Sequence, residues 1–412
     1  MGDGGDCVLQ WSWLTALASV LVMAAGLCAA GASAAEAAPG KGVATDAAPG
    51  KSPAAKADPF AVPDGSPDEL LKYLESVGDL EPPAGDRETL LQFSKKAARS
   101  ILTATDKILA AKPSENQAIE AVQWRIGALE MLVRSGDPQA RARLDGLPGE
   151  LEKAGWAKLA RGARGMMLGS ALEAFDGDDP KAFEPLIEQV KAYVSQGELG
   201  RAEIGLMMQA AFTAERLGTE LAVRTYEDFA KLLSASQNKE IAAVGATMQG
   251  AARRLTLVGK PMALAGVTLG GEKLDWAKYR GKVVLVTFWA TWCGPCREEI
   301  KSIRKNYAAY RDKGFEVVAI SIDKDRTQLE EYLKQAAFPW TVVFDQSLRS
   351  EQADQTMATA YGVMQIPQLI LVGKDGNVLA LDVRGARLKK LLRGLLGEPD
   401  QPAESQPAQT PS

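Results

Sequence analysis

The chain has 412 residues, of which 46 % are apolar and 24 % charged, and its net charge is −4. This length predicts two or three domains, and the slightly acidic balance argues against nucleic acid as a partner. The sequence contains no histidine, which excludes His-ligated metal sites, Ser-His-Asp and Cys-His nucleophilic systems, and acid–base catalysis by histidine. Any catalysis must therefore use thiol, carboxylate, amine, hydroxyl or backbone groups.

The stretch 7–35 carries no charge and is long enough to cross a bilayer. It ends in Ala32-Ser33-Ala34, a small-residue pattern typical of signal-peptidase cleavage. The residues before it include two aspartates and no Lys or Arg, which the positive-inside rule does not favour for export. Despite this charge bias, we interpret residues 1–34 as a cleaved signal peptide or a membrane anchor rather than as a segment with neither role. We expect the protein in the periplasm or cell envelope, either secreted or membrane-anchored.

Two segments lack the hydrophobic periodicity of packed structure. Residues 35–65 are rich in Pro, Ala and Gly and are predicted to be a flexible linker. Residues 398–412 contain four prolines and are predicted to be a disordered tail.

Residues 66–256 are predicted to form an all-helical bundle or short solenoid, because their apolar residues recur at spacings of three and four. Ser66 with Glu69, and Ser114 with Gln117, are typical of capping boxes at helix starts. No polar cluster in this region indicates a catalytic site, so we expect a domain that docks a protein or self-associates. The expected helices cover about 66–78, 86–112, 114–135, 149–175, 184–196, 200–217, 219–235 and 238–255, with Pro185 kinking or restarting a helix that could begin at Asp179-Pro180.

Residues 257–397 change pattern at Gly259-Lys260-Pro261. The stretch 282–290 is continuously apolar and β-branched, which predicts a strand buried on both faces of a parallel sheet. Asp375-Gly376 predicts a hairpin turn. The order of strands and helices predicts an α/β thioredoxin-like fold, with strands at 282–290, 315–322, 341–344, 369–372 and 378–383, and helices at 297–312, 327–337, 353–361 and 388–396.

The four cysteines include one Cys-x-x-Cys, at the end of the 282–290 strand. Two thiols on the first turn of a helix can attack a disulfide and then resolve the mixed disulfide. Cys293 lies where helix N–H groups favour an anion, so we expect a lowered pKa and a nucleophilic role, with Cys296 as the resolving thiol. Gly294 and Pro295 shape the turn between them, and Trp292 is expected to form the rim.

These residues, with the flanking strand and the downstream Ile366-Pro367, resemble the thioredoxin superfamily, and in particular its TlpA/ResA type of exported thiol-disulfide oxidoreductase. The resemblance covers about a third of the chain. It implies that Ile366-Pro367 is a cis peptide facing the cysteines, and that the backbone of Ile366 pairs with an extended segment of the substrate.

The resemblance leaves the proton carrier for Cys296 open. Thioredoxin has an Asp in the core strand at the position that Thr287 occupies here. The TlpA/ResA type has a Glu three residues after the second cysteine, which is Glu299 in this chain. One helical turn separates Glu299 from Cys296, so we expect Glu299 to serve as the catalytic base, the alternative being a solvated acid that only complements the helix dipole.

The resemblance implies an extracytoplasmic thiol-disulfide oxidoreductase, in the reducing direction, that acts on oxidised client proteins, with cytochrome c maturation as one family role. A membrane thiol carrier would supply its electrons, and we expect no metal and no cofactor. The main alternative is a helical interaction scaffold with a redox-regulated thioredoxin-like accessory domain. A peroxidase and a copper carrier are less favoured, since the cysteines lie within one turn and the chain lacks histidine.

Overall fold

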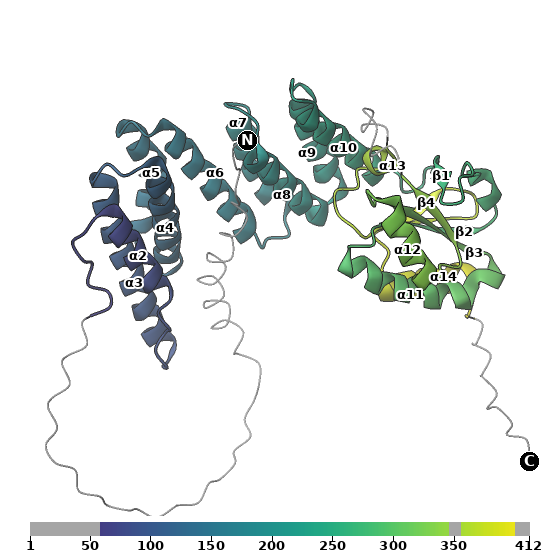
Figure 1. Ribbon diagram of the computed structural model, residues 1–412, viewed down its shortest axis with the longest axis horizontal. Helices are drawn as coiled ribbons and strands as arrows, with labels where there is room; N and C mark the ends of the chain where they lie inside the picture. The colour runs from purple at the N-terminus through teal and green to yellow at the C-terminus, as the bar shows by residue number, and fades with distance from the viewer. Residues whose placement is uncertain (1–57, 346–355, 400–412) are drawn as a thin grey trace, which may run out of the picture. The chain divides into compact units, whose positions relative to one another are not determined.

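The computed structural model describes residues 58–345 and 356–399 (Figure 1). The predicted signal peptide or anchor, most of the predicted linker and most of the predicted tail lie outside these ranges. Within them, no helix combines the length and the apolar character that a membrane span requires.

The chain divides into two compact units, residues 1–167 and residues 168–412. The first unit is helical, and its amphipathic helices bury a common apolar core that includes Leu74, Ile101 and Leu129. The capping boxes at Ser66 and Ser114 are both present. Its helices are α2 (Pro67–Gly78), α3 (Arg87–Ala110), α4 (Glu115–Arg134), α5 (Ala140–Lys153) and the first part of α6 (Ala157–Ala174).

One expected helix is two in the structure. The predicted helix at 149–175 is broken between α5 and α6, where Gly155 adopts a positive φ of 86°. Glycine reaches this left-handed conformation without a steric penalty and so commonly ends a helix.

The second unit contains further helices followed by the sheet. These helices bury an apolar cluster around Phe183, Tyr226 and Phe229. The prediction that Pro185 restarts a helix was wrong, because the helix begins at Pro180, capped by the Asp179 side chain, and continues through Pro185. The helices are α7 (Pro180–Val194), α8 (Arg201–Leu217), α9 (Thr219–Ser234) and α10 (Lys239–Leu255).

The division into units does not fall at residues 256 and 257, where the sequence analysis placed a domain boundary. The chain that leaves α10 joins the sheet directly: the Gly259 N–H donates to the Val378 carbonyl at 2.8 Å, and the Val378 N–H donates to the Lys260 carbonyl at 2.8 Å. Helices α7–α10 therefore belong to the same compact unit as the sheet.

The sheet has six strands in the order β1-β4-β3-β2-β5-β6. Strands β2, β3 and β4 are parallel, whereas β5 runs antiparallel to β2, β6 to β5, and β1 to β4. This is the predicted α/β thioredoxin-like fold. The strands are β1 (Val267–Thr268), β2 (Val283–Trp289), β3 (Phe315–Ser321), β4 (Thr341–Phe344), β5 (Gln368–Val372) and β6 (Val378–Leu381).

Strand β2 is buried along its whole length, as its unbroken apolar sequence predicts. Alternate residues face two different cores. Leu285 and Trp289 contact the core beneath α11, α12 and α14, whereas Val286 and Phe288 contact the core that includes Met357 of α13. The helices of this fold are α11 (Gly294–Tyr310), α12 (Arg326–Ala336), α13 (Met357–Ala360) and α14 (Gly385–Leu396), with short 3₁₀ turns η2 (Trp276–Tyr279) and η3 (Arg311–Lys313).

Three details differ from the prediction. Helix α11 begins at Gly294 rather than at residue 297, because Cys293 itself is the N-cap. The short strand β1 was not predicted, since two residues carry no periodicity. Of the helix expected at 353–361, the structure describes the short helix α13 (Met357–Ala360), and residues 353–355 lie outside the described ranges.

Candidate active site

Cys293 and Cys296 lie at the point where β2 has ended and α11 begins. Their sulfur atoms form a disulfide bond, with the two Cα atoms 5.2 Å apart. The backbone N–H of Cys296 points at the Cys293 sulfur from 3.2 Å. A helix N-terminus with such an N–H stabilises a thiolate once the pair is reduced.

Both cysteines are buried, Cys293 slightly less so than Cys296. The exposed fraction is 5 % for Cys293 and 1 % for Cys296. Gly294 and Pro295 are the first two residues of α11, where the missing N–H of proline leaves no helical hydrogen bond unmade. Trp292 is 66 % exposed and forms the rim beside Cys293. An incoming disulfide therefore meets Trp292 and Cys293 before it can meet Cys296.

The segment 361–367, which we call the proline loop, brings a distant part of the chain to the cysteines. The Ile366–Pro367 peptide bond is cis, as the resemblance implied. The carbonyl oxygen of Ile366 lies 3.8 Å from the Cys293 sulfur. Arg384 donates to the Pro367 carbonyl, and the buried Gln368 donates to Asp382 at 3.0 Å. The loop thus presents a backbone edge beside the more exposed sulfur.

Asp323 supports the cysteine loop and was missed by the sequence analysis. Its buried carboxylate accepts the Thr291 N–H at 3.1 Å, the Thr291 hydroxyl at 2.7 Å and the Ser321 hydroxyl at 2.7 Å. Thr291 lies two residues before Cys293, so Asp323 fixes the start of the active-site loop. The sequence did contain a signal for this contact: Thr291 follows β2 and Asp323 follows β3, and these two strands are parallel. Polar residues that follow neighbouring parallel strands meet at one edge of the sheet.

Glu299 lies on α11, one turn beyond Cys296. Its carboxylate accepts the Gly385 N–H at the start of α14 at 3.4 Å, so it also joins two helices. Thr287 is buried in β2, and its place in the alternation puts it on the α11 side of the sheet. Glu299 thus lies one helical turn from Cys296, and its role as a base stays a prediction.

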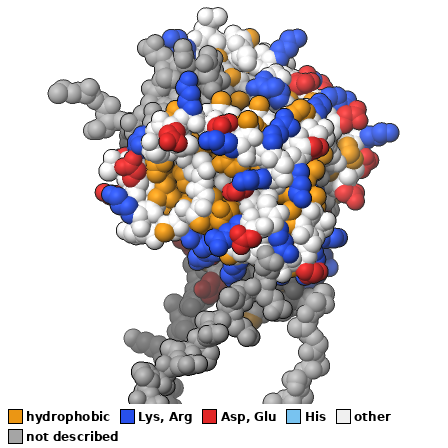
Figure 2. Space-filling view, turned by 90° about the vertical axis from the view of Figure 1, so that its right-hand side faces the viewer, with side chains coloured by type: hydrophobic (Ala, Val, Ile, Leu, Met, Phe, Trp, Pro, Cys, Tyr) orange, Lys and Arg blue, Asp and Glu red, His pale blue; other side chains and the backbone are white. Residues whose placement is uncertain are grey.

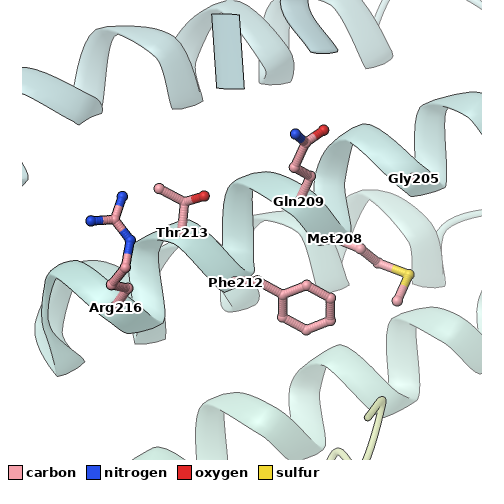
Figure 3. A pocket seen from close by; sticks show the side chains of 6 residues that line it. All are labelled: Gly205, Met208, Gln209, Phe212, Thr213 and Arg216. Carbon is pink, nitrogen blue, oxygen red and sulfur yellow. The ribbon is translucent and has the colours of Figure 1, made fainter. Parts of the chain in front are cut away.

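A separate hollow of about 450 Å³ lies along α8 (Figure 3). Met208 and Phe212 point to one side of the helix, and Gln209, Thr213 and Arg216 to the other. Arg216 already donates to the carbonyls of Gly177 and Phe175 at 3.2 and 3.3 Å. Arg216, the only charged side chain among the described residues that line this hollow, is therefore engaged within the chain, and we assign the hollow no ligand.

The surface on the side of the sheet carries basic and acidic side chains interspersed with apolar ones (Figure 2). This face therefore offers no uniform charge of one sign to a polyanion.

Several solved structures are similar to the C-terminal part of the chain. The thioredoxin domain of a thiol-disulfide oxidoreductase from Bacteroides vulgatus is 26 % identical, with a TM-score of 0.31, and the match covers 34 % of this chain and 97 % of that one. A putative thiol:disulfide interchange protein DsbE from Chlorobium tepidum is 30 % identical, with a TM-score of 0.29, and the match covers 32 % of this chain and 93 % of that one.

The sequence comparisons coincide with the site. The profile of the Redoxin family matches residues 243–391. The thiol-disulfide oxidoreductase ResA of Bacillus anthracis is 32 % identical over 128 residues, which cover 31 % of this chain and 69 % of that protein. ResA of Bacillus thuringiensis subsp. konkukian is 30 % identical with the same coverage. With its bonded cysteine pair at the start of α11, the chain belongs to the TlpA/ResA-type thiol-disulfide oxidoreductases of the thioredoxin superfamily.

Proposed function

We propose that this enzyme reduces disulfides of client proteins outside the cytoplasm through Cys293 and Cys296. The observation that carries the proposal is the placement of the more exposed sulfur, Cys293, at a helix N-terminus and 3.8 Å from the Ile366 carbonyl. This arrangement offers an attacking thiolate and a backbone edge for the client at the same place.

The reaction follows from the two thiols. The Cys293 thiolate attacks one sulfur of the client disulfide, forms a mixed disulfide and expels the other client sulfur as a thiolate, which takes up a proton. Cys296 then loses its proton and attacks the Cys293 sulfur. The Cys293–Cys296 disulfide forms and the second client thiolate leaves. Two electrons pass to the client, and an external dithiol, which we propose to be a membrane thiol carrier, restores the reduced pair.

The client would lie along the proline loop. An extended client segment would pair with the backbone of Ile366, while Trp292, at the rim, would contact the residues that flank the client cysteine. The resembling family includes proteins that reduce the haem-binding cysteines of apocytochrome c, and we propose such a protein as one candidate client, by analogy alone.

Glu299 is the proposed base for Cys296, because it lies one helical turn beyond that thiol. Glu299→Gln keeps the size of the side chain and its contact with Gly385 but cannot accept a proton. We expect resolution of the mixed disulfide to slow at least about a hundredfold near neutral pH, measured by rapid acid quench, with the first attack by Cys293 unchanged. Glu298→Gln, on the neighbouring exposed acid, is the matched control. Equal rates in both variants would leave Glu299 as a link between α11 and α14.

The direction of the reaction is tested by the reduction potential of the Cys293–Cys296 pair in the purified protein. A potential below about −220 mV would support the reducing role, whereas one above about −150 mV would identify an oxidant. The absence of a reversible couple would contradict the redox function and turn attention to the scaffold alternative.

The proposed location outside the cytoplasm rests on the uncharged stretch 7–35. Cell fractionation and N-terminal sequencing of the mature protein test it. Cleavage after Ala34, or retention in the membrane with the folded part outside, would support the proposal, and recovery of the intact chain from the cytoplasm would contradict it.

A further inference from the structure

Helix α10 touches the redox fold at two glycines. A Cβ atom built on Gly250 would lie 2.0 Å from the carbonyl oxygen of Thr359 and 2.6 Å from the backbone nitrogen of Gly362. A Cβ atom on Gly362 would lie 1.9 Å from the backbone nitrogen of Ala251. Since real Cβ atoms do not approach so closely, the backbones of α10 and of the segment after α13 are in direct contact, and a side chain at either glycine would force them apart.

This contact lies at the start of the proline loop, and neighbouring contacts continue along it. The exposed Arg253 of α10 donates to the Ala360 carbonyl at 3.3 Å. Met364, in the middle of the loop, packs against the apolar cluster of helices α7–α10. The last part of the loop is Ile366, whose carbonyl faces Cys293. Helix α10 therefore supports the loop on the side away from the sulfur.

A polar cluster on the helices lies within electrostatic reach of Asp382, near the other end of the loop. The hydroxyl of the buried Tyr226, on α9, donates to Glu215 at 2.5 Å, and Glu215 pairs with the buried Arg254 at 3.0 Å. Burial raises the pKa of Tyr226, and Glu215 and Asp382 raise it further. Asp382 accepts the hydrogen bond of Gln368, the residue after Pro367. Asp382 thus holds the residue after the loop and also acts electrostatically on Tyr226 of α9.

We propose that Gly250 is a positioning residue of the redox site: by letting α10 contact residues 359–362, it holds the proline loop where the Ile366 backbone can receive an extended client. The inference rests on the proposed contact between Ile366 and the client. It assigns helix α10 a part in binding the client, while thiol–disulfide exchange at Cys293 needs only the start of α11.

The test compares Gly250→Ala with Gly205→Ala in the full chain. Both glycines are helical, but a Cβ on Gly205 would meet nothing within 4 Å. Pre-reduced protein is mixed with an oxidised peptide that contains one disulfide, or with the small disulfide 5,5′-dithiobis(2-nitrobenzoate). Oxidation of the cysteine pair is followed by the fluorescence of the tryptophans, which include Trp292 beside Cys293.

For Gly250→Ala we expect the half-saturating peptide concentration to rise about fivefold, with the maximum rate, the rate with the small disulfide and the reduction potential unchanged. Gly205→Ala should match the wild type with both substrates. If Gly250→Ala does not fold, the substitution Arg253→Ala, at an exposed position of α10, serves as the test. We then expect the half-saturating peptide concentration to rise about twofold, with no change for the small disulfide.

Three results would overturn the inference. The first is unchanged half-saturation in Gly250→Ala or, where that variant does not fold, in Arg253→Ala. The second is an equal loss with both substrates, which indicates a purely structural contact. The third is a wild-type chain that reacts with the small disulfide but never saturates with the peptide, which contradicts the proposed client contact as well.

Discussion

The two helical regions of this chain look alike in sequence but differ in what they pack against. The apolar core of helices α2–α5 is built from residues 60–167, all in the first unit. The cluster of helices α7–α10 includes Met364 of the proline loop. Amphipathic periodicity therefore shows that a helix buries one face, but it does not show which partner covers that face.

Helical glycines mark the same difference. Gly149 and Gly162, in the first unit, would meet nothing within 4 Å if they carried a Cβ atom. Gly245 and Gly250, in α10, would meet backbone atoms within 3 Å, those of Ser234 and Thr359 respectively. A glycine inside a helix costs up to about 1 kcal/mol relative to alanine. In α10 that cost permits close approach, whereas at Gly149 and Gly162 no neighbouring atom explains it.

The largest expected effect tests whether the chemistry belongs to the second unit alone. Cys293→Ser should lower the rate of client reduction on the order of a thousandfold or more, because a serine hydroxyl cannot form the mixed disulfide. Cys296→Ser should still attack and should accumulate the mixed disulfide through Cys293, detectable as an added mass after alkylation. Residual turnover in Cys293→Ser would place a second redox group elsewhere in the chain.

The next effect tests whether α7–α10 are part of the redox unit. A chain of residues 157–399 keeps these helices, whereas a chain of residues 257–399 removes them and exposes the surface beneath Met364 and Gly362. We expect the shorter chain to lose at least about 2 kcal/mol of unfolding free energy, from the exposure of apolar side chains. Urea denaturation of both chains measures this. Equal stability would support the predicted boundary at residues 256 and 257.

The sequence was sufficient for features that depend on local chemistry. The capping boxes at Ser66 and Ser114, the buried strand β2 and the Cys-x-x-Cys turn each follow from neighbouring residues, and each is present. The place of the proline loop came from the resemblance. Contacts between distant segments are harder to predict: no local pattern encodes Gly250 against Thr359, whereas the contact of Asp323 with Thr291 could have been inferred only from the order of the parallel strands.

Asp323 allows a smaller test inside the redox fold. Asp323→Asn replaces one of the two carboxylate oxygens by an NH2 group, which cannot accept a hydrogen bond, so the remaining oxygen cannot keep all the bonds from Thr291 and Ser321. We expect a loss of about 1–3 kcal/mol in unfolding free energy and a severalfold slower attack by Cys293, because the loop that carries it is less well fixed. Ser321→Ala, which removes one donor to the carboxylate, should cost about 1 kcal/mol. Slower attack in neither variant would limit Asp323 to stabilising the fold.

The smallest effect compares one tyrosine from each unit, in each case through its hydroxyl group. The Tyr226 hydroxyl donates to Glu215, whereas that of Tyr73 is buried without a hydrogen-bond partner among residues 58–345 and 356–399. Tyr226→Phe should therefore cost about 1–2 kcal/mol at neutral pH, and Tyr73→Phe should be close to neutral. The two substitutions remove the same atom, so the difference between them isolates the Glu215 contact.

The stability that the Tyr226 hydroxyl contributes depends on pH, and the sign of this dependence follows from its pKa shift. Burial, and then Glu215, raises the pKa of Tyr226 above its ordinary value of about 10. The folded chain thus holds this proton more tightly than the unfolded chain does. The resulting stability is complete below about pH 10 and is lost as the pH rises from there towards the folded pKa. The wild type should therefore lose its advantage over Tyr226→Phe between pH 9 and about pH 11, as measured by urea denaturation. A constant difference over that range would mean that the fold does not hold the Tyr226 proton, and that the hydrogen bond to Glu215 is weaker than its geometry indicates.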